Sequence, residues 1–285
     1  MLVDTKPTTF DELIRISGLS HGTDVWLGNA QSLIEAGTVT LQDAICCRDD
    51  IMIYLIKQGL PPNPAFKIME TVRKGKALKD PAKWEEYKNL MKEHDVPDWY
   101  IKSCEKIKYM FPKAHAAAYV TNAFRIAWFK VHQPLAYYAA YFTIRADEFD
   151  SEYMIFGKEK VKNKMKEIDL EGNAATVKDK NMYAILELVL EMYERGFKFL
   201  PIDLYKSHST KFIVEEDGIR PPLNSIPGLG TVAAEGIEAA KKDGKFMSID
   251  DMKIRSKVGN SVADLLKKFG CLEGMSQSNQ MSLFG

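Results

Sequence analysis

The sequence of 285 residues contains only four cysteines, and their spacing excludes the common cysteine frameworks. Cys46 and Cys47 are adjacent, while Cys104 and Cys271 lie far from them and from each other. Neither a C-x-x-C zinc pair nor a disulfide framework can be built from this spacing. The pattern therefore fits a cytoplasmic protein that folds under reducing conditions.

Long hydrophobic runs and several well-known catalytic motifs are also missing. No stretch approaches the roughly 18 consecutive apolar residues that a membrane-spanning helix needs. Residues 1–6 lack the charged and then apolar layout of a signal peptide. We find no G-x-x-x-x-G-K-S/T phosphate loop, no H-E-x-x-H zinc motif and no nucleophile elbow. We therefore expect no membrane contact and no metal ion bound by this chain.

A net charge is absent too, because 39 lysines and arginines balance 39 aspartates and glutamates. The distribution is nevertheless uneven. Residues 1–60 contain four basic and eight acidic residues, whereas residues 101–145 contain seven basic residues and one acidic residue. Such a local excess is typical of a segment that holds phosphates, and the overall pI of about 7.0 conceals it.

What the sequence does contain is a mostly helical pattern. With 46% hydrophobic and 27% charged residues, the chain can bury a sizeable core. Apolar residues recur with the helical period through the first two thirds, and Pro134 is expected to end or kink a long helical stretch. Residues 197–201 and 211–214 are expected to form short strands or extended segments. The predicted fold class is mostly α, with a few short strands and a flexible tail from residue 275.

Local capping residues indicate where some helices begin. Asn29 is a plausible cap for a helix through Ile34, and Asp49 or Asp50 for the next helix. The cluster Arg48-Asp49-Asp50 could instead pair carboxylates around a metal ion. Adjacent acids would point to different faces, however, which favours the capping role. We see no internal repeat in the sequence.

The sharpest local motif is a glycine hairpin at residues 226–234. Gly228 and Gly230 bracket Leu229 directly before a helix, so the turn can adopt positive φ and can point free helix N–H groups at a phosphate. Leu229 is expected to plug the hairpin into the core. The pattern is similar to the helix-hairpin-helix motif of proteins that bind DNA without sequence specificity, and an ordinary helix–helix turn is the alternative. The predicted DNA-binding residues are Gly228, Leu229, Gly230, Thr231, Lys241 and Lys242.

A second motif lies on the helix predicted after Phe111-Pro112. His115, Tyr119 and Asn122 are spaced at i, i+4 and i+7, so they share one face. A cation, a histidine, a tyrosine and an arginine along one helix could hold a triphosphate and stack a base. The spacing alone favours core packing. The candidate nucleotide-binding residues are Lys113, His115, Tyr119, Asn122 and Arg125.

The C-terminal residues form a third motif. Two large apolar residues at the end of a polar tail could anchor in an apolar pocket of a partner, with Gln280 fixing the orientation. A tail that packs back onto its own domain is the alternative. The candidate partner-binding residues are Gln280, Met281, Ser282, Leu283 and Phe284.

These three motifs, in this order, resemble the C-terminal portion of the PolC-type DNA polymerase III alpha subunit, a family C replicative polymerase of low-GC Gram-positive bacteria. The run His21-Gly22-Thr23-Asp24-Val25-Trp26, within residues 16–26, favours PolC over the related DnaE polymerases. Residues 111–119 are similar to the Phe-x-Lys-Ser-His-Ala-x-Ala-Tyr run of DnaE, and Lys130 and Pro134 match the Lys-x-x-x-Pro pattern that follows it. The tail resembles the Gln-x-Ser-Leu-Phe peptide that docks replicases on the sliding clamp. The resemblance extends over essentially the whole chain.

The resemblance implies a nucleotidyltransferase that copies DNA. It implies a fingers domain at residues 1–205, a helix-hairpin-helix domain that binds duplex DNA at residues 206–274, and a clamp-binding tail at residues 275–285. The implied partners are primer–template DNA, deoxynucleoside triphosphates, the beta sliding clamp and the rest of the polymerase. In this family the palm carboxylates, which precede the fingers, hold two Mg²⁺ ions.

No catalytic residue is therefore expected in this chain, which alone should not polymerise DNA. It would be one piece of a longer or a split polymerase. A stand-alone DNA-binding accessory protein of the replication machinery is the main alternative. A purely structural helical adaptor would require the basic segment and the glycine hairpin to be coincidences.

Overall fold

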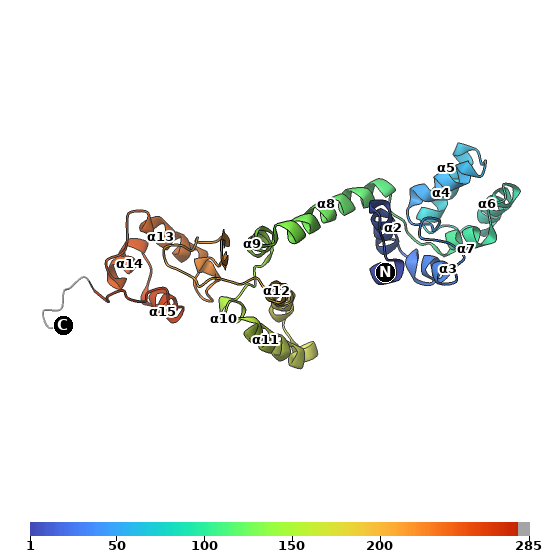
Figure 1. Ribbon diagram of the computed structural model, residues 1–285. Coiled ribbons are helices and arrows are strands. Elements are labelled where there is room, and N and C mark those ends of the chain that lie inside the picture. The colour runs from blue at the N-terminus through green and yellow to red at the C-terminus, as the bar shows by residue number, and fades with distance from the viewer. Residues whose placement is uncertain (279–285) are drawn as a thin grey trace. The chain divides into compact units, whose positions relative to one another are not determined.

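The computed structural model describes residues 1–278 and divides the chain into two compact units, with the boundary between Arg125 and Ile126. Most of the described residues are helical, and their one sheet has two strands (Figure 1). The predicted mostly α fold class is thereby confirmed. Within residues 1–278, no helix combines the length and the apolar character that crossing a membrane would require.

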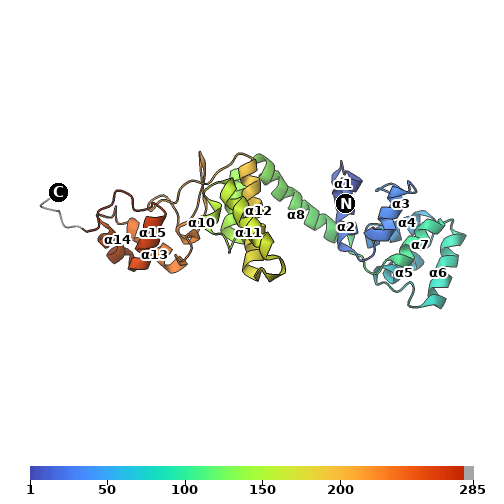
Figure 2. The same ribbon diagram turned by 90° about the horizontal axis from the view of Figure 1, so that it is seen from below.

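The first unit consists of short helices around one hydrophobic core. Its elements are α1 (Leu2–Thr5), α2 (Phe10–His21), the π-helical turn η1 (Trp26–Ala30), α3 (Gln31–Glu35), α4 (Arg48–Lys57), α5 (Pro62–Arg73), α6 (Pro81–Glu93), α7 (Asp98–Lys106) and the first part of α8 (Lys113–His132). Helices α4 and α5 lie side by side (Figures 1 and 2). Ile51 and Leu55 of α4 and Ile68 of α5 are completely buried. Burial of these apolar side chains, as part of a larger core, stabilises this unit.

Two neighbouring aspartates fix the starts of two different helices. Asp50 accepts hydrogen bonds from the backbone N–H groups of Cys46 and Cys47 at 3.1 and 2.8 Å, in a capping box at the start of α4. Of the two acids predicted to cap this helix, Asp50 does so, from the third helical position, while Cys47 occupies the N-cap position itself. Asp49 instead accepts the backbone N–H of Lys113 at 2.6 Å, so it caps the distant helix α8.

The prediction that Asn29 caps a helix was wrong. Helix α3 begins at Gln31 without a side-chain cap. The Asn29 side chain is buried, where it donates to the carbonyl oxygens of Asp24 and Ser103 and accepts from the Ser103 hydroxyl at 2.7 Å. Asn29 therefore ties the loop after α2 to α7, because a buried amide is stable only when its polar atoms are paired.

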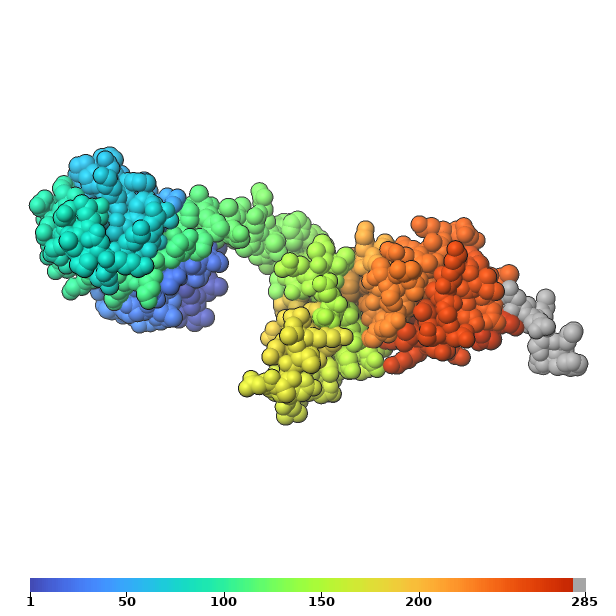
Figure 3. Space-filling view, turned by 180° about the vertical axis from the view of Figure 1, so that it is seen from behind, coloured from blue at the N-terminus to red at the C-terminus, as the bar shows by residue number. Residues whose placement is uncertain are grey.

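The second unit has two cores, one aromatic and one aliphatic. Its elements are the remainder of α8, α9 (Pro134–Arg145), α10 (Ser151–Met154), α11 (Lys158–Glu171), the 3₁₀ turn η2 (Gly172–Ala174), α12 (Val177–Glu194), β1 (Ile213–Glu215), β2 (Gly218–Arg220), the 3₁₀ turn η3 (Leu223–Ser225), α13 (Thr231–Lys241), α14 (Ile249–Ser256) and α15 (Asn260–Lys268). Helices α11 and α12 lie side by side (Figure 2). In Figure 3, α13 to α15 (orange to red) form one compact body, whose core contains Leu229, Ile237 and Leu266.

Pro134 separates two helices, as predicted from the sequence. Helix α8 ends at His132, and α9 begins at Pro134, where the missing N–H costs no hydrogen bond. Of the two alternatives for residues 197–201, a short strand or an extended segment, the structure contains no strand there. Only an isolated bridge joins Phe199 to Ile219, and Pro201 has no N–H with which to continue a ladder.

The predicted strand at residues 211–214 is displaced along the chain. Strand β1 begins at Ile213 and pairs antiparallel with β2, so that Val214 lies opposite Ile219. Ile219 is fully buried and belongs to the aromatic core of the second unit. The short sheet therefore leads the chain from that core to the region of α13.

Candidate nucleic-acid and nucleotide sites

The first hairpin, residues 226–231, joins η3 to α13 and is here called hairpin 1. Gly228 has φ +85°, a conformation that glycine adopts far more readily than other residues. Leu229 is only 2% exposed and packs into the core, where the sequence predicts it. Gly230 precedes α13 without any side-chain cap, and a Cβ added there would meet no atom within 4 Å. The first N–H groups of α13 are therefore open to a phosphate.

A second hairpin, missed in the sequence, joins α14 to α15 and is called hairpin 2. Lys257 adopts the left-handed conformation with φ 56°, and Val258 behind it is half-buried. Gly259 precedes α15 without a side-chain cap and, like Gly230, has open space beside it. Asn260 begins the helix, and its side-chain oxygen accepts from Lys253 at 3.0 Å.

The two hairpins are structural repeats of each other. A left-handed residue, an apolar residue and a capping glycine follow in the same order, and each helix then buries an alanine, Ala234 or Ala263, in its first turn. One turn later each buries an aliphatic residue, Ile237 or Leu266. Our reading that the sequence has no internal repeat was therefore wrong. The second copy is hard to recognise in the sequence because Lys257 stands at the position equivalent to Gly228.

The two lysines grouped with the hairpin lie at the other end of α13. Lys241 is the last residue of that helix and Lys242 is its C-cap, about 15 Å along the axis from the hairpin glycines. The ammonium group of Lys241 donates to the carbonyl oxygen of Ser207 at 2.6 Å, and burial lowers the pKa of this lysine. Lys242 is exposed. The structure thus brings the four hairpin residues together and places the lysine pair elsewhere.

An acidic pocket borders hairpin 1 on one side. Asp147, Glu148 and Asp150 line it together with Lys178 and the hairpin backbone. Burial raises the pKa of Asp150. These carboxylates repel phosphates, so the charge of this pocket opposes a DNA backbone on that side of the hairpin.

Helix α8 has a packing face and an exposed face within the first unit. Ala116 is buried, and Ala117 and Val120 are packed against the core. The opposite face carries Tyr119, which is 61% exposed, and Asn122. Core packing, the alternative reading of the spacing, therefore does not account for Tyr119. Its exposed ring is available to a ligand.

The aromatic residues before and along α8 form a continuous stack. Phe111 stacks on His115 with ring centroids 5.0 Å apart, and His115 lies 4.5 Å from Tyr119. His21 meets the edge of Phe111 at 6.1 Å, whereas Asp24 pairs with Lys108 at 2.6 Å. His21 and Asp24 thus have different partners. The stack holds His115 and Tyr119 in place on one face of α8.

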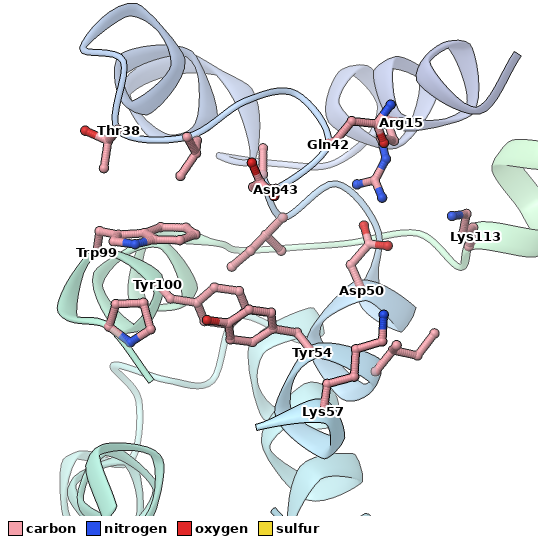
Figure 4. A pocket seen from close by; sticks show the side chains of 15 residues that line it. Arg15, Thr38, Gln42, Asp43, Asp50, Tyr54, Lys57, Trp99, Tyr100 and Lys113 are labelled. Atoms are coloured by element: carbon pink, nitrogen blue, oxygen red, sulfur yellow. The ribbon is translucent and has the colours of Figure 1, made fainter. Parts of the chain in front are cut away.

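Lys113 points away from this face. Two helical positions separate Lys113 from His115, which is a rotation of about 200°. Its ammonium group pairs with Asp11 at 3.2 Å and reaches the rim of a pocket of about 690 Å³. Figure 4 shows this pocket, with Arg15 and Asp50 pointing toward each other beside Lys113, and with three aromatic side chains on the other side. The structure therefore groups His115, Tyr119 and Asn122, and it separates Lys113 from them.

Arg125 lies further along α8 and is exposed. Within residues 1–278 we find no ion pair or hydrogen bond to the side chains of Arg125 or Asn122, so both can contact a ligand without losing a partner. The predicted partner-binding residues 280–284 lie outside the described residues.

Comparisons with known protein families give matches in two separate regions of the chain. Residues 1–95 match the bacterial DNA polymerase III alpha subunit finger domain, and residues 196–282 match the helix-hairpin-helix motif. Over 284 residues the chain is 56% identical to the PolC-type DNA polymerase III of Caldanaerobacter subterraneus subsp. tengcongensis and 58% identical to that of Oceanobacillus iheyensis. It is 57% identical to the protein of the same name from Bacillus subtilis. The alignments cover 100% of this chain and 20%, 20% and 19% of these relatives, so the chain spans about a fifth of their length.

Proposed function

We propose that this chain, which belongs to the PolC-type DNA polymerase III family and matches one segment of it, forms part of a replicative DNA polymerase. In that enzyme it would supply the fingers and the contacts that hold duplex DNA. The family expected from the sequence is confirmed by identity over the whole chain, and a fingers domain and a helix-hairpin-helix motif are confirmed over residues 1–95 and 196–282. The domain boundary at residues 205 and 206 stays a prediction. We propose further that the polymerase works in the cytoplasm.

The observation that carries the proposal is the pair of uncapped helix N-termini behind Gly230 and Gly259. Backbone N–H groups at such positions bind phosphate oxygens without reading bases, because every nucleotide offers the same phosphate. A replicative polymerase must hold primer–template DNA of any sequence. Two such hairpins in one compact body suit that requirement.

The exposed face of α8 is proposed to meet the incoming deoxynucleoside triphosphate. His115 and Tyr119 would contact the sugar or base, and Asn122 would add a hydrogen bond. Arg125 would offset charge on the triphosphate. Lys113 would join them only by leaving Asp11, which pairs with it at 3.2 Å. The finger-domain match ends at residue 95, so support for these roles comes from the exposed face and from the resemblance of residues 111–119.

The remaining parts of the proposal concern groups outside the described residues. The tail, residues 280–284, would dock the beta sliding clamp and raise the effective concentration of the polymerase at the primer end. We also propose, from the resemblance alone, that the Mg²⁺ ions and the catalytic carboxylates belong to the palm rather than to this chain.

The duplex grip is tested by fluorescence anisotropy with a primer–template duplex across a salt series. Gly228→Asp/Gly230→Asp places two carboxylates where phosphates would bind, and we expect affinity to fall about a hundredfold at low salt. Gly196→Asp/Gly244→Asp is the matched control, because it adds the same charge at other exposed glycines of the second unit and should bind like wild type. Equal affinity of both variants would contradict the proposal and favour an ordinary turn.

The nucleotide role is tested in the polymerase that contains this chain. Arg125→Ala should raise the KM for nucleotide about tenfold, because it removes a charge-assisted contact to phosphate. Lys67→Ala, which removes an exposed cation on α5, is the control. An unchanged KM in the Arg125 variant would remove this residue from the nucleotide site. Salt-sensitive duplex binding with no effect of nucleotide would favour the accessory-protein alternative.

A further inference from the structure

A cluster of exposed lysines surrounds a pocket in the first unit, away from α8. The pocket has a volume of about 520 Å³. Four lysines from two segments of the chain line it, and a fifth, Lys76, lies in one of these segments. We call Lys74, Lys76, Lys79, Lys106 and Lys108 the lysine patch.

A glycine brings the two lysine-bearing segments into direct contact. Gly75 has φ +62°, and a Cβ added there would lie 2.5 Å from the carbonyl oxygen of Lys108. The N–H of Met110 donates to the carbonyl oxygen of Arg73 at 3.3 Å, and that of Lys108 donates to Thr23 at 3.1 Å. The segment that carries Lys106 and Lys108 is therefore held between two neighbouring loops. The patch is built by backbone contacts rather than by chance proximity of long side chains.

The nearby carboxylates neutralise only part of the lysine patch, because they pair with two of its five lysines. Asp24 pairs with Lys108 at 2.6 Å and Glu70 with Lys74 at 2.7 Å. Glu105, which also lines the pocket, accepts from the indole of Trp84 at 2.8 Å and has Lys88 of α6 at 3.6 Å.

The other three lysines keep their charge available. Lys106 donates to the carbonyl oxygen of Gly28 at 2.7 Å, which leaves its charge uncompensated. For the side chains of Lys76 and Lys79, no ion pair or hydrogen bond is found within residues 1–278. The patch therefore carries an excess of positive charge. Because the surface is concave, the electrostatic field of these charges is concentrated in the pocket.

The pocket also offers apolar surface beside the charges. Leu27 and Leu78 line it and are 75% and 69% exposed. Exposed leucines next to cations suit a ligand that has both apolar faces and anionic groups. An unpaired nucleotide is such a ligand, because its base is free of a duplex stack while its phosphate stays charged.

We propose that the lysine patch binds the single-stranded part of the template. Lys76, Lys79 and Lys106 hold the backbone phosphates, and an unpaired base lies against Leu27 and Leu78. A duplex fits this surface less well, because its bases are stacked inside and cannot enter a pocket. The inference relies on the proposed function only in taking DNA as the polyanion.

The test measures anisotropy with three probes: a blunt duplex, the same duplex with an unpaired template overhang, and the free single strand. Lys76→Glu/Lys79→Glu alters two lysines that have no native partner, so the fold is spared. We expect about tenfold weaker binding of the overhang duplex and the single strand, a salt slope smaller by about 1.4, and unchanged binding of the blunt duplex. Lys67→Glu/Lys92→Glu, which makes the same charge change on α5 and α6 outside the pocket, should leave all three affinities unchanged.

The outcomes separate this inference from the proposed function. If the overhang adds no affinity in the wild type, or if both variants lose affinity equally, the inference is overturned. An equal loss on the blunt duplex would also overturn it, since the patch would then bind duplex. If the single strand binds through the patch while the wild type ignores the blunt duplex, the inference stands and the duplex grip fails.

Discussion

Hairpins 1 and 2 have the same backbone geometry but different side chains. Hairpin 1 uses Gly228 at the left-handed position and buries Leu229 almost completely. Hairpin 2 places Lys257 at that position and buries Val258 only by half. The backbone conformation and the capping glycine therefore define this motif, while the first residue can be exchanged for a cation. Hairpin 1 contributes more to the core, and hairpin 2 carries an exposed positive charge at its turn.

The largest difference between the hairpins should appear in stability. Leu229→Ala is expected to lower the free energy of unfolding by about 3 kcal/mol, because it leaves a cavity in a well-packed core, whereas Val258→Ala should cost about 1 kcal/mol. Urea denaturation followed by circular dichroism measures both values. Equal losses would show that the two hairpins anchor the body of α13 to α15 equally.

A smaller difference should appear on exchange of the left-handed residues. Gly228→Ala should lower the free energy of unfolding by about 1 kcal/mol, because its φ of +85° is strained for alanine and its Cβ would lie 3.3 Å from the side chain of Leu265. Lys257→Gly should raise the free energy of unfolding by about 0.5 kcal/mol. The substitution relieves the strain of the left-handed conformation, and the greater entropy of the unfolded chain offsets part of this gain.

The substitution Lys257→Gly should also weaken duplex binding by about fivefold, because one phosphate contact is lost. Stability and affinity would then move in opposite directions in this variant. A variant that loses both would show that Lys257 supports the fold rather than the DNA contact.

Much of the fold could be predicted because the determining residues act locally. Pro134 ends α8 through its own ring, and the two glycines of hairpin 1 mark their own turn. Asp50 was recognised as a cap for the same reason, whereas the bond of Asp49 to the remote Lys113 was not predicted. Asn29 was assigned wrongly because its partner, Ser103, is remote in sequence, and no local pattern reveals a buried hydrogen bond between distant segments.

The candidate sites also divide into those that local sequence reveals and those that depend on contacts between distant segments. The shared face of His115, Tyr119 and Asn122 follows from helical spacing alone. Hairpin 2 was missed because recognition relied on two glycines, and the sequence Lys257-Val258-Gly259 keeps only one. The lysine patch could not be predicted, because Gly75 and Lys108 meet only after folding.

The contact between Asp49 and the start of α8 bears on how the protein is made. The carboxylate that accepts the Lys113 N–H stands 64 residues earlier in the chain. A ribosome therefore releases Asp49 and α4 before it releases the first turn of α8. When Lys113 emerges, the acceptor for its N–H is therefore already part of the chain, and the first turn of α8 can be capped as soon as it forms.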